Sequence, residues 1–230
     1  MMYGYHWDLS TPLSFAISIL PILLIGLEVT LAATALGFLI AMALGLVFAL
    51  LRRSPVRAIA WPVGVFVEFI RDTPLLVQLY FLYFVLPKYG ITLPAFMTGA
   101  IALGLQYSAY TSEVYRAGLD AIRRGQWEAA AALNLPRWRL YSDVLIPQAI
   151  PRIIPALGNY LVSMLKDTPI LSTITVVEML NLANLIGDRT FEYLVPLSMV
   201  GVIFLLLTLI CSAGIRSIEA LMPRAGVPLR

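Results

Sequence analysis

Long apolar runs separated by short polar segments make up most of this 230-residue chain. Each run reaches or exceeds the ~20 residues that a helix needs to cross the hydrocarbon core of a bilayer. The runs are continuous instead of alternating, which favours membrane-spanning helices over a barrel. We expect five spans, with four or six as alternatives. They cover about residues 20–51, 56–86 and 96–115, a stretch that begins near Ile153, and about residues 193–215.

Composition agrees with this all-α membrane class. The chain is 60% hydrophobic and only 13% charged, and a soluble domain of this length has no way to bury so much apolar surface. The net charge of +3 is too small to suggest nucleic acid. Cys211 and His6 are the only residues of their types, which excludes an internal disulfide and argues against a Cys-based metal site and a catalytic triad.

The N-terminal region leaves two alternatives open. The first twenty residues contain no Lys or Arg, so the basic start of a cleavable signal is missing. Tyr3, Tyr5 and Trp7 suit either the membrane interface or packing against the protein itself. Glu28, inside the first run, is either a functional carboxylate or a wetted residue near a helix end.

Small residues recur at every fourth position of the first run, at Ala33, Gly37, Ala41, Gly45 and Ala49. Such a stripe allows a second helix to approach closely in lipid. The third run becomes polar in its second half, which we expect to face protein or water. Its polar residues there are Gln106, Tyr107, Ser108, Tyr110, Thr111, Ser112 and Glu113.

Residues 116–152, here named the charged loop, differ from the apolar sequence on either side. They hold six arginines and three carboxylates: Arg116, Arg123, Arg124, Arg137, Arg139, Arg152, Asp120, Glu128 and Asp143. Ala129 to Leu133 favours a helix, Asn134 suits a left-handed end to it, and Pro136 suits the first turn of the next helix. The pattern predicts a short helix, a tight corner and a second short helix, which together form a docking element.

The arginines and lysines also predict an orientation. With the N-terminus outside, twelve of them lie in the inner loops and tail, and only Lys88 and Arg189 lie in the outer segments. This bias places the charged loop and the C-terminus in the cytoplasm. The expected organisation is an outer lead-in at residues 1–19, a transmembrane domain at 20–220 and a tail at 221–230.

A short motif occurs twice, as RDTPLL at residues 71–76 and KDTPIL at residues 166–171. Arg71 and Lys166 each follow a cytoplasmic arginine by fourteen residues, so both should lie roughly 20 Å along inward-starting helices. Pro74 should kink or break its helix. Paired charges beside prolines suit either a polar pathway for a solute or a brace between helices, and a similarity this short also arises by chance.

The charged loop resembles the EAA loop of bacterial binding-protein-dependent ABC permeases. Glu128, Ala129 and Ala130 match the start of that motif, Asn134 takes its glycine position, and residues 144–147 (VLIP) match its end. The segments RDTPLLVQL, EVYRAGLDAIRRGQWEAA and ALGNYL are similar to polar amino-acid uptake permeases. The combination LQYSAYTSEVYRAG, AALNLP and MLKDTPILSTITVVEML looks most like the ectoine/hydroxyectoine permeases.

The resemblance implies a type I ABC importer permease in the bacterial inner membrane. Such a chain works with cytoplasmic ATPase subunits, a second permease that is identical or different, and an extracytoplasmic solute-binding protein. No phosphate-binding loop occurs in the sequence, so ATP and Mg²⁺ are expected on the ATPase, with no cofactor on this chain. The chain itself is therefore not expected to be an enzyme.

Two sets of residues follow from the resemblance and the repeated motif. The ATPase-coupling set is Gly125, Glu128, Ala129, Ala130, Asn134 and Pro147. The substrate-path set is Arg71, Asp72, Thr73, Lys166, Asp167, Thr168 and Glu113. A secondary transporter or channel that needs no ATPase is the alternative, but it does not explain the helix–corner–helix loop.

Overall fold

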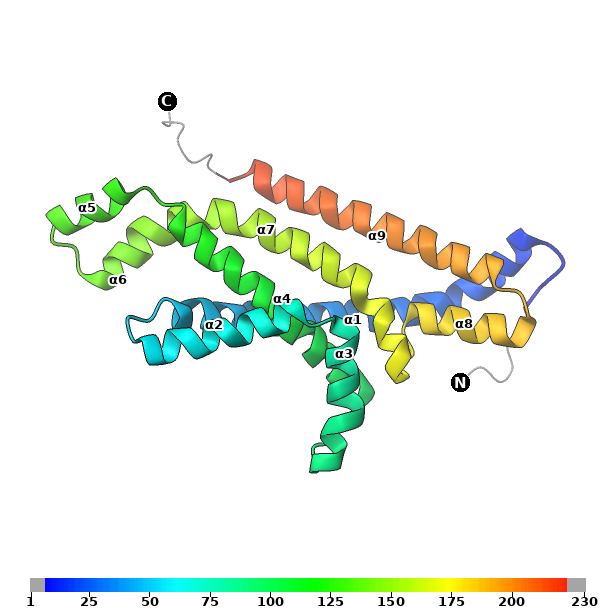
Figure 1. The fold of residues 1–230 in the computed structure, drawn as a ribbon. Coiled ribbons are helices and arrows are strands. Elements are labelled where there is room, and N and C mark those ends of the chain that lie inside the picture. Colours follow the sequence, from blue (N-terminus) through cyan, green and yellow to red (C-terminus); the bar gives the residue numbers. More distant parts are fainter. Residues whose placement is uncertain (1–6, 223–230) are drawn as a thin grey trace. The chain divides into compact units, whose positions relative to one another are not determined.

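The computed structural model describes residues 7–222, and every regular element in that range is helical (Figure 1). Two compact units make up this part of the chain. Unit 1 contains residues 7–37, Pro74–Leu103 and Met164–Ile210. Unit 2 contains Phe38–Thr73, Gly104–Ser163 and residues 211–222. The long helices α1, α4, α7 and α9 contribute residues to both.

The elements follow one another from α1 to α9, with short π and 3-10 segments named η. In chain order they are α1 (Pro12–Arg52), α2 (Arg57–Asp72), α3 (Leu75–Tyr80), η1 (Phe81–Val85), η2 (Leu86–Tyr89), α4 (Ala95–Asp120), α5 (Arg124–Ala132), α6 (Arg137–Arg139), η3 (Leu140–Leu145), α7 (Ile146–Asp167), η4 (Thr168–Ile174), α8 (Met179–Thr190) and α9 (Leu194–Ala220).

Unit 1 has its core where the first part of α1 meets α8. Phe15, Ile19 and Leu23 on α1 are buried against Met179 and Ile186 on α8. The polar residues in the segment EMLNLANLIGDRTFE, residues 178–192, predict a loop with at most a short helix in it. That prediction of a loop is wrong in its main part. A helix there turns its apolar face to the core, and only the short helix foreseen within that loop is confirmed.

Two close contacts set the position of α8. A Cβ added at Gly26 would lie 2.8 Å from the backbone nitrogen of Met179, so α1 and α8 can approach only without a side chain there. Glu178, fully buried, caps α8 by accepting hydrogen bonds from the backbone N–H groups of Leu180 (2.9 Å) and Asn181 (2.7 Å). The partly buried Trp7 also packs against this core, whereas Tyr3 and Tyr5 lie outside the described residues.

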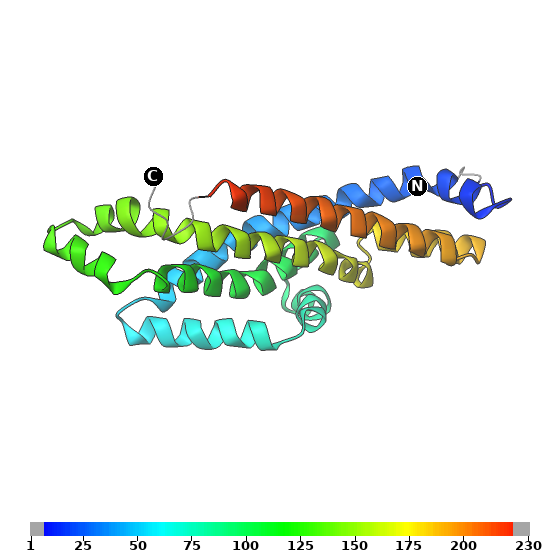
Figure 2. The same ribbon diagram turned by 90° about the horizontal axis from the view of Figure 1, so that it is seen from above.

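The break expected at Pro74 is confirmed. Thr73 and Pro74 are both extended, and they separate α2 of unit 2 from α3 of unit 1. The segment from Leu75 to Tyr89 continues as one helical rod through α3, η1 and η2, and Figure 2 views this rod nearly along its axis. It ends at Gly90, whose φ of 83° is the left-handed conformation that favours glycine.

Unit 2 packs the second part of α1 against the second part of α4. The hydroxyl of Thr111 donates a hydrogen bond of 2.8 Å to the backbone carbonyl of Ala41. A Cβ added at Gly45 would lie 2.9 Å from the carbonyl oxygen of Ser108. The packing role of the small-residue stripe is confirmed here, and in unit 1 Gly37 lies against Leu103 in the same way. The polar half of α4 is buried as expected, at Gln106, Ser108, Thr111 and Ser112.

Helix boundaries differ from the expected spans at two places. α1 begins at Pro12 rather than near residue 20, and its 41 residues amount to roughly 60 Å. The helix that carries the fourth span does not begin near Ile153 but is already formed at Arg137, running through α6 and η3 into α7. Pro151 and Pro155 lie inside α7 without ending it.

Two helices of the described residues are long and apolar enough to cross a membrane, α1 and α9. Two further pairs of helices, each interrupted by a short break, raise that number to four. The 26-residue helix α4 is long enough, but its polar second half keeps it out of this count. The expected five spans are reached only if α4 also crosses the membrane, in addition to these four.

Candidate functional site

The charged loop forms a helix–corner–helix element in unit 2 (Figure 1). The first helix is α5, and the corner lies at Leu133–Pro136. The second helix was expected to be short, and that expectation is wrong. It continues without a break into α7, so the corner stands at the end of a long helix that leads back into the body of the unit.

The corner is a Schellman motif centred on Asn134, whose φ is 53°. The backbone N–H of Leu135 donates to the carbonyl of Ala130 (3.1 Å), and the N–H of Asn134 donates to the carbonyl of Ala131 (2.9 Å). These two bonds satisfy carbonyls that the end of α5 would otherwise leave unpaired. The left-handed conformation predicted for Asn134 is confirmed, and Pro136, two residues later, is the N-cap of α6.

The loop has a small apolar core of its own. Ile122, Leu145 and Ala149 are buried there, with Trp127 and Leu140 packed against them. Ala130 points inward and is only 3% exposed. The side-chain amides of Gln126 and Gln148 add a hydrogen bond of 3.1 Å between α5 and α7. The loop is therefore a folded element and not an extended connection.

The outer face of the loop carries most of the coupling residues expected from the sequence. Gly125, Glu128, Ala129, Asn134 and Pro147 are all exposed. Two large apolar side chains of the same loop are also exposed, Leu133 at 73% and Trp138 at 64%. No arginine within residues 7–222 forms an ion pair with Glu128. An unpaired carboxylate among exposed apolar groups is typical of a surface that another protein covers.

A second group of charges in unit 2 centres on Glu113 of α4 and is here named the Glu113 network. The Glu113 carboxylate accepts hydrogen bonds from Arg52 at the end of α1 and from Arg116 one turn later (2.6 Å). Arg71 of α2 lies 3.9 Å from Glu113 and 3.2 Å from Glu68. The ends of three helices are thus tied to one carboxylate.

The Glu113 network extends to Asp120, which forms ion pairs with Arg53 and, at 3.4 Å, with Arg116. Arg116 is therefore held between two carboxylates of its own helix, Glu113 and Asp120. The candidate residues predicted from the sequence include Glu113 and Arg71 of this network. They do not include Arg52 and Arg116. The spacing of Glu113, Arg116 and Asp120 at three and four residues was the available signal.

Three tyrosines line the side of α4 and α7 in unit 2 near Arg71. Tyr110 and Tyr160 stack with ring centroids 5.5 Å apart, and Tyr107 meets Tyr160 edge-on at 6.2 Å. The guanidinium carbon of Arg71 lies 5.9 Å from the centre of the Tyr110 ring. Arg71 therefore has both a carboxylate and an aromatic partner, an arrangement that serves a brace and a polar pathway equally well.

The two copies of the repeated motif belong to different units. Arg71 and Asp72 end α2 in unit 2, and Thr73 is its C-cap. Asp72 is exposed, and the Thr73 hydroxyl donates to the carbonyl of Phe69 at 2.7 Å. Lys166 and Asp167 end α7 and Thr168 begins η4, all in unit 1.

In the unit 1 copy, Lys166 and Asp167 are exposed, whereas Thr168 is buried and donates to the carbonyl of Leu165 at 2.7 Å. The chain therefore continues differently after each motif, into an extended break after Thr73 and into the 3-10 turn η4 after Asp167. In residues 7–222 no three His, Cys, Asp or Glu side chains are grouped to hold a metal ion.

Comparison with known proteins decides the family. Residues 41–222 match the family of binding-protein-dependent transport system inner membrane components. The chain belongs to this family. It is 61% identical, over the full length of both chains, to a probable amino-acid ABC transporter permease protein, y4tG, of Sinorhizobium fredii. It is also 36% identical to the arginine transport system permease protein ArtQ of Bacillus subtilis, covering 87% of this chain and 92% of that one.

A solved structure shares the fold of this permease. The crystal structure of an amino acid ABC transporter with histidines superposes with a TM-score of 0.85 at 37% identity, covering 89% of this chain and 95% of that one. The protein is thus the multi-pass inner-membrane permease subunit of an amino-acid ABC importer, with the type I importer fold. It is not the enzyme of that system: ATP hydrolysis belongs to a separate ATPase, and a solute-binding protein delivers the substrate.

Proposed function

We propose that this permease couples to its ATPase through the outer face of the charged loop. The observation that carries the proposal is the Schellman corner at Asn134, which presents Glu128, Ala129 and Leu133 on one folded and exposed element. A groove in the ATPase would cover the apolar side chains and supply a donor to the Glu128 carboxylate. Gly125 and Pro147 lie exposed on the same element, and Ala130 holds it together from within.

Movement of the loop would reach the spans through rigid contacts within unit 2. The loop is continuous with α7, and Gly118 of α4 lies directly against Ile153 of α7. A displacement of the corner would therefore move α7, and the close contact between Ile153 and Gly118 would transmit this movement to α4. We propose that ATP binding draws the two ATPase subunits together and, through this lever, opens the path to the binding protein.

The substrate we propose is a small zwitterionic solute, either a polar amino acid or ectoine or hydroxyectoine. Its path would display both signs of charge, with Arg71, Asp72, Thr73 and Glu113 in unit 2 and Lys166, Asp167 and Thr168 in unit 1. Each charged end of a zwitterion then finds a partner as its hydration is removed. Relatives whose names specify arginine and histidine support the amino-acid class.

The proposed assembly has two permease chains, identical or different, embedded in lipid and joined to two ATPase subunits. ATP and Mg²⁺ bind to the ATPase subunits, and this chain holds no cofactor. We propose five spans with α4 as the third, an outer N-terminus at residues 1–19 and a cytoplasmic tail at 221–230. The distribution of basic residues supports this orientation.

The direct test is uptake by the purified complex reconstituted in vesicles with its binding protein. ATP-dependent accumulation of arginine, histidine, glutamine or ectoine is expected inside, and the preferred solute identifies the substrate. Uptake that proceeds without ATP would instead establish the secondary transporter or channel. Uptake with ATP only of anions or uncharged sugars would overturn the zwitterion proposal but leave the ATPase coupling in place.

A further inference from the structure

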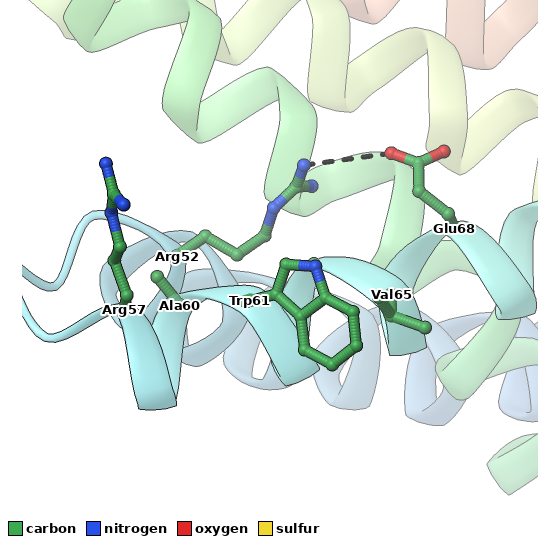
Figure 3. Close-up of a pocket in the computed structure, with 7 residues that line it drawn as sticks. Arg52, Arg57, Ala60, Trp61, Val65 and Glu68 are labelled. Carbon is green, nitrogen blue, oxygen red and sulfur yellow. Dashed lines mark ion pairs between the residues drawn. The ribbon is translucent and has the colours of Figure 1, made fainter.

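An open groove of about 810 Å³ runs along one face of α2 in unit 2, beside the end of α1 (Figure 3). Apart from Arg52, its lining residues come from α2 and recur at steps of three and four, so they share one side of that helix. The lining consists of Arg52, Arg57, Ala60, Trp61, Gly64, Val65 and Glu68. Neither the charged loop nor the repeated motif contributes to it.

The groove changes its chemistry along its length. Arg57 is the first residue of α2 and is exposed. Trp61, 72% exposed, follows about 6 Å further along the helix, and Val65 follows at about 12 Å. Ala60 and Gly64 also line the groove, and their small size leaves space beside Trp61 and Val65. From Arg57 to Val65 the lining passes from a cation to an amphipathic ring and then to an apolar side chain, which is the order of a phospholipid from headgroup to acyl chain, and the ion pair of Glu68 with Arg52 closes the far end.

The charges at this end of unit 2 do not cancel. The Glu113 network holds Arg52, Arg53, Arg71 and Arg116 against the three carboxylates of Glu68, Glu113 and Asp120. Arg57 adds a fifth guanidinium, and no carboxylate of residues 7–222 pairs with it. Of the two arginines that line the groove, Arg52 is paired with Glu68 and Glu113, so Arg57 is the one uncompensated positive charge at its mouth, and it attracts an anion from the membrane surface.

We propose that this groove binds a phospholipid with a net negative headgroup. Its phosphate lies at Arg57, its glycerol region lies against the indole of Trp61, and an acyl chain follows Gly64 and Val65. Arg52 is already engaged by Glu68 and Glu113, as Figure 3 shows for Glu68, so Arg57 is the residue that confers headgroup preference. Free phosphate lacks the chain that the apolar part of the groove accommodates.

Quenching of Trp61 fluorescence tests this proposal in the assembled transporter. The complex is placed in nanodiscs that contain either brominated phosphatidylglycerol or brominated phosphatidylcholine, over the same series of mole fractions. The Trp61 signal is isolated by subtracting a Trp61→Phe complex. The anionic lipid should quench Trp61 at an about fivefold lower mole fraction, the effect of one arginine at a membrane surface.

Arg57→Gln should bring the two lipids close to equal quenching, whereas Arg216→Gln, an exposed arginine on α9 outside the groove, should leave the preference intact. Added inorganic phosphate should not displace the lipid. Equal quenching by both lipids in the unmodified complex would overturn the headgroup preference. Absence of quenching by either lipid would show that another protein subunit covers this face, which also contradicts the proposal.

Discussion

The carboxylate of Glu113 on α4 accepts a hydrogen bond from Arg52, the last residue of α1, across 61 positions of the sequence. Both side chains are partly buried, with 17% of Arg52 and 23% of Glu113 exposed. This pair and its neighbours tie α1, α2 and α4 at one end of unit 2. The same end leads into the charged loop through Asp120, so the Glu113 network supports the element that is proposed to receive the ATPase.

Removal of the central charge should weaken unit 2. Glu113→Gln leaves Arg52, Arg71 and Arg116 close together without their shared carboxylate, and we expect a loss of roughly 2 kcal/mol in unfolding free energy. Thermal unfolding of the purified permease in detergent measures the effect. Glu219→Gln, an exposed carboxylate at the end of α9, is the matched control and should change little. Equal melting temperatures for both variants would show that the Glu113 network does not stabilise the fold.

Close helix packing should make one glycine irreplaceable and leave another free to change. Gly45→Ala places a Cβ against the Thr111 hydroxyl and 2.9 Å from the carbonyl of Ser108, so we expect a loss of about 1–3 kcal/mol. A Cβ at Gly214 meets nothing within 4 Å, and Gly214→Ala should gain up to about 1 kcal/mol from helix propensity. The two melting temperatures should move in opposite directions. Stability that is unaffected by Gly45→Ala would contradict the packing of α1 on α4.

The Schellman corner should accept glycine and reject branched residues at position 134. Asn134→Gly keeps the left-handed conformation and should retain full transport. Asn134→Val should cost about 1–2 kcal/mol or more, because a branched side chain opposes that conformation. Limited proteolysis of the charged loop gives the readout, with faster cleavage expected only for the valine variant. Similar cleavage of both variants would mean that the corner does not hold the loop.

The two basic residues of the repeated motif should respond differently to neutralisation. Arg71→Gln removes contacts to Glu68, Glu113 and the Tyr110 ring, so both stability and uptake should fall. Lys166 is exposed, and Lys166→Gln should change uptake or selectivity at unchanged melting temperature. Uptake in vesicles and thermal unfolding are measured on the same preparations. Normal uptake and selectivity in both variants would make the pair structural braces.

Much of the fold follows from local patterns in the sequence. Two features depend on the stereochemistry of a single residue: the left-handed conformation of Asn134 and the helix break at Pro74. A third, the packing stripe on α1, depends on small residues that recur at every fourth position. The packing of α8 did not follow, because the segment 178–192 as a whole suggested a polar loop with at most a short helix. Glu178 is in fact buried as the helix cap, a role that only the three-dimensional neighbourhood reveals.

Most residues of the candidate site could be predicted from the sequence, but the ion pairs that they form could not. The charged loop was recognised from its arginines and from Glu128, Ala129 and Ala130, although the inward direction of Ala130 depends on the corner geometry. The partnership of Arg52 with Glu113 joins residues far apart in the sequence, and no local period indicates it. Long-range ion pairs require the packing of α1 on α4 to be known first.

ATPase retention by a Glu128→Lys permease tests the central claim most directly. The complex is purified from membranes through a tag on the permease, and bound ATPase is measured with ATP-driven uptake of the substrate. Glu128→Lys should reach the membrane in normal amounts, since Glu128 is exposed and unpaired with any arginine of residues 7–222, but lose most of its ATPase and its uptake. Glu219→Lys, the matched control, should retain both. Full ATPase association and full uptake by Glu128→Lys would show that the charged loop is not the coupling element.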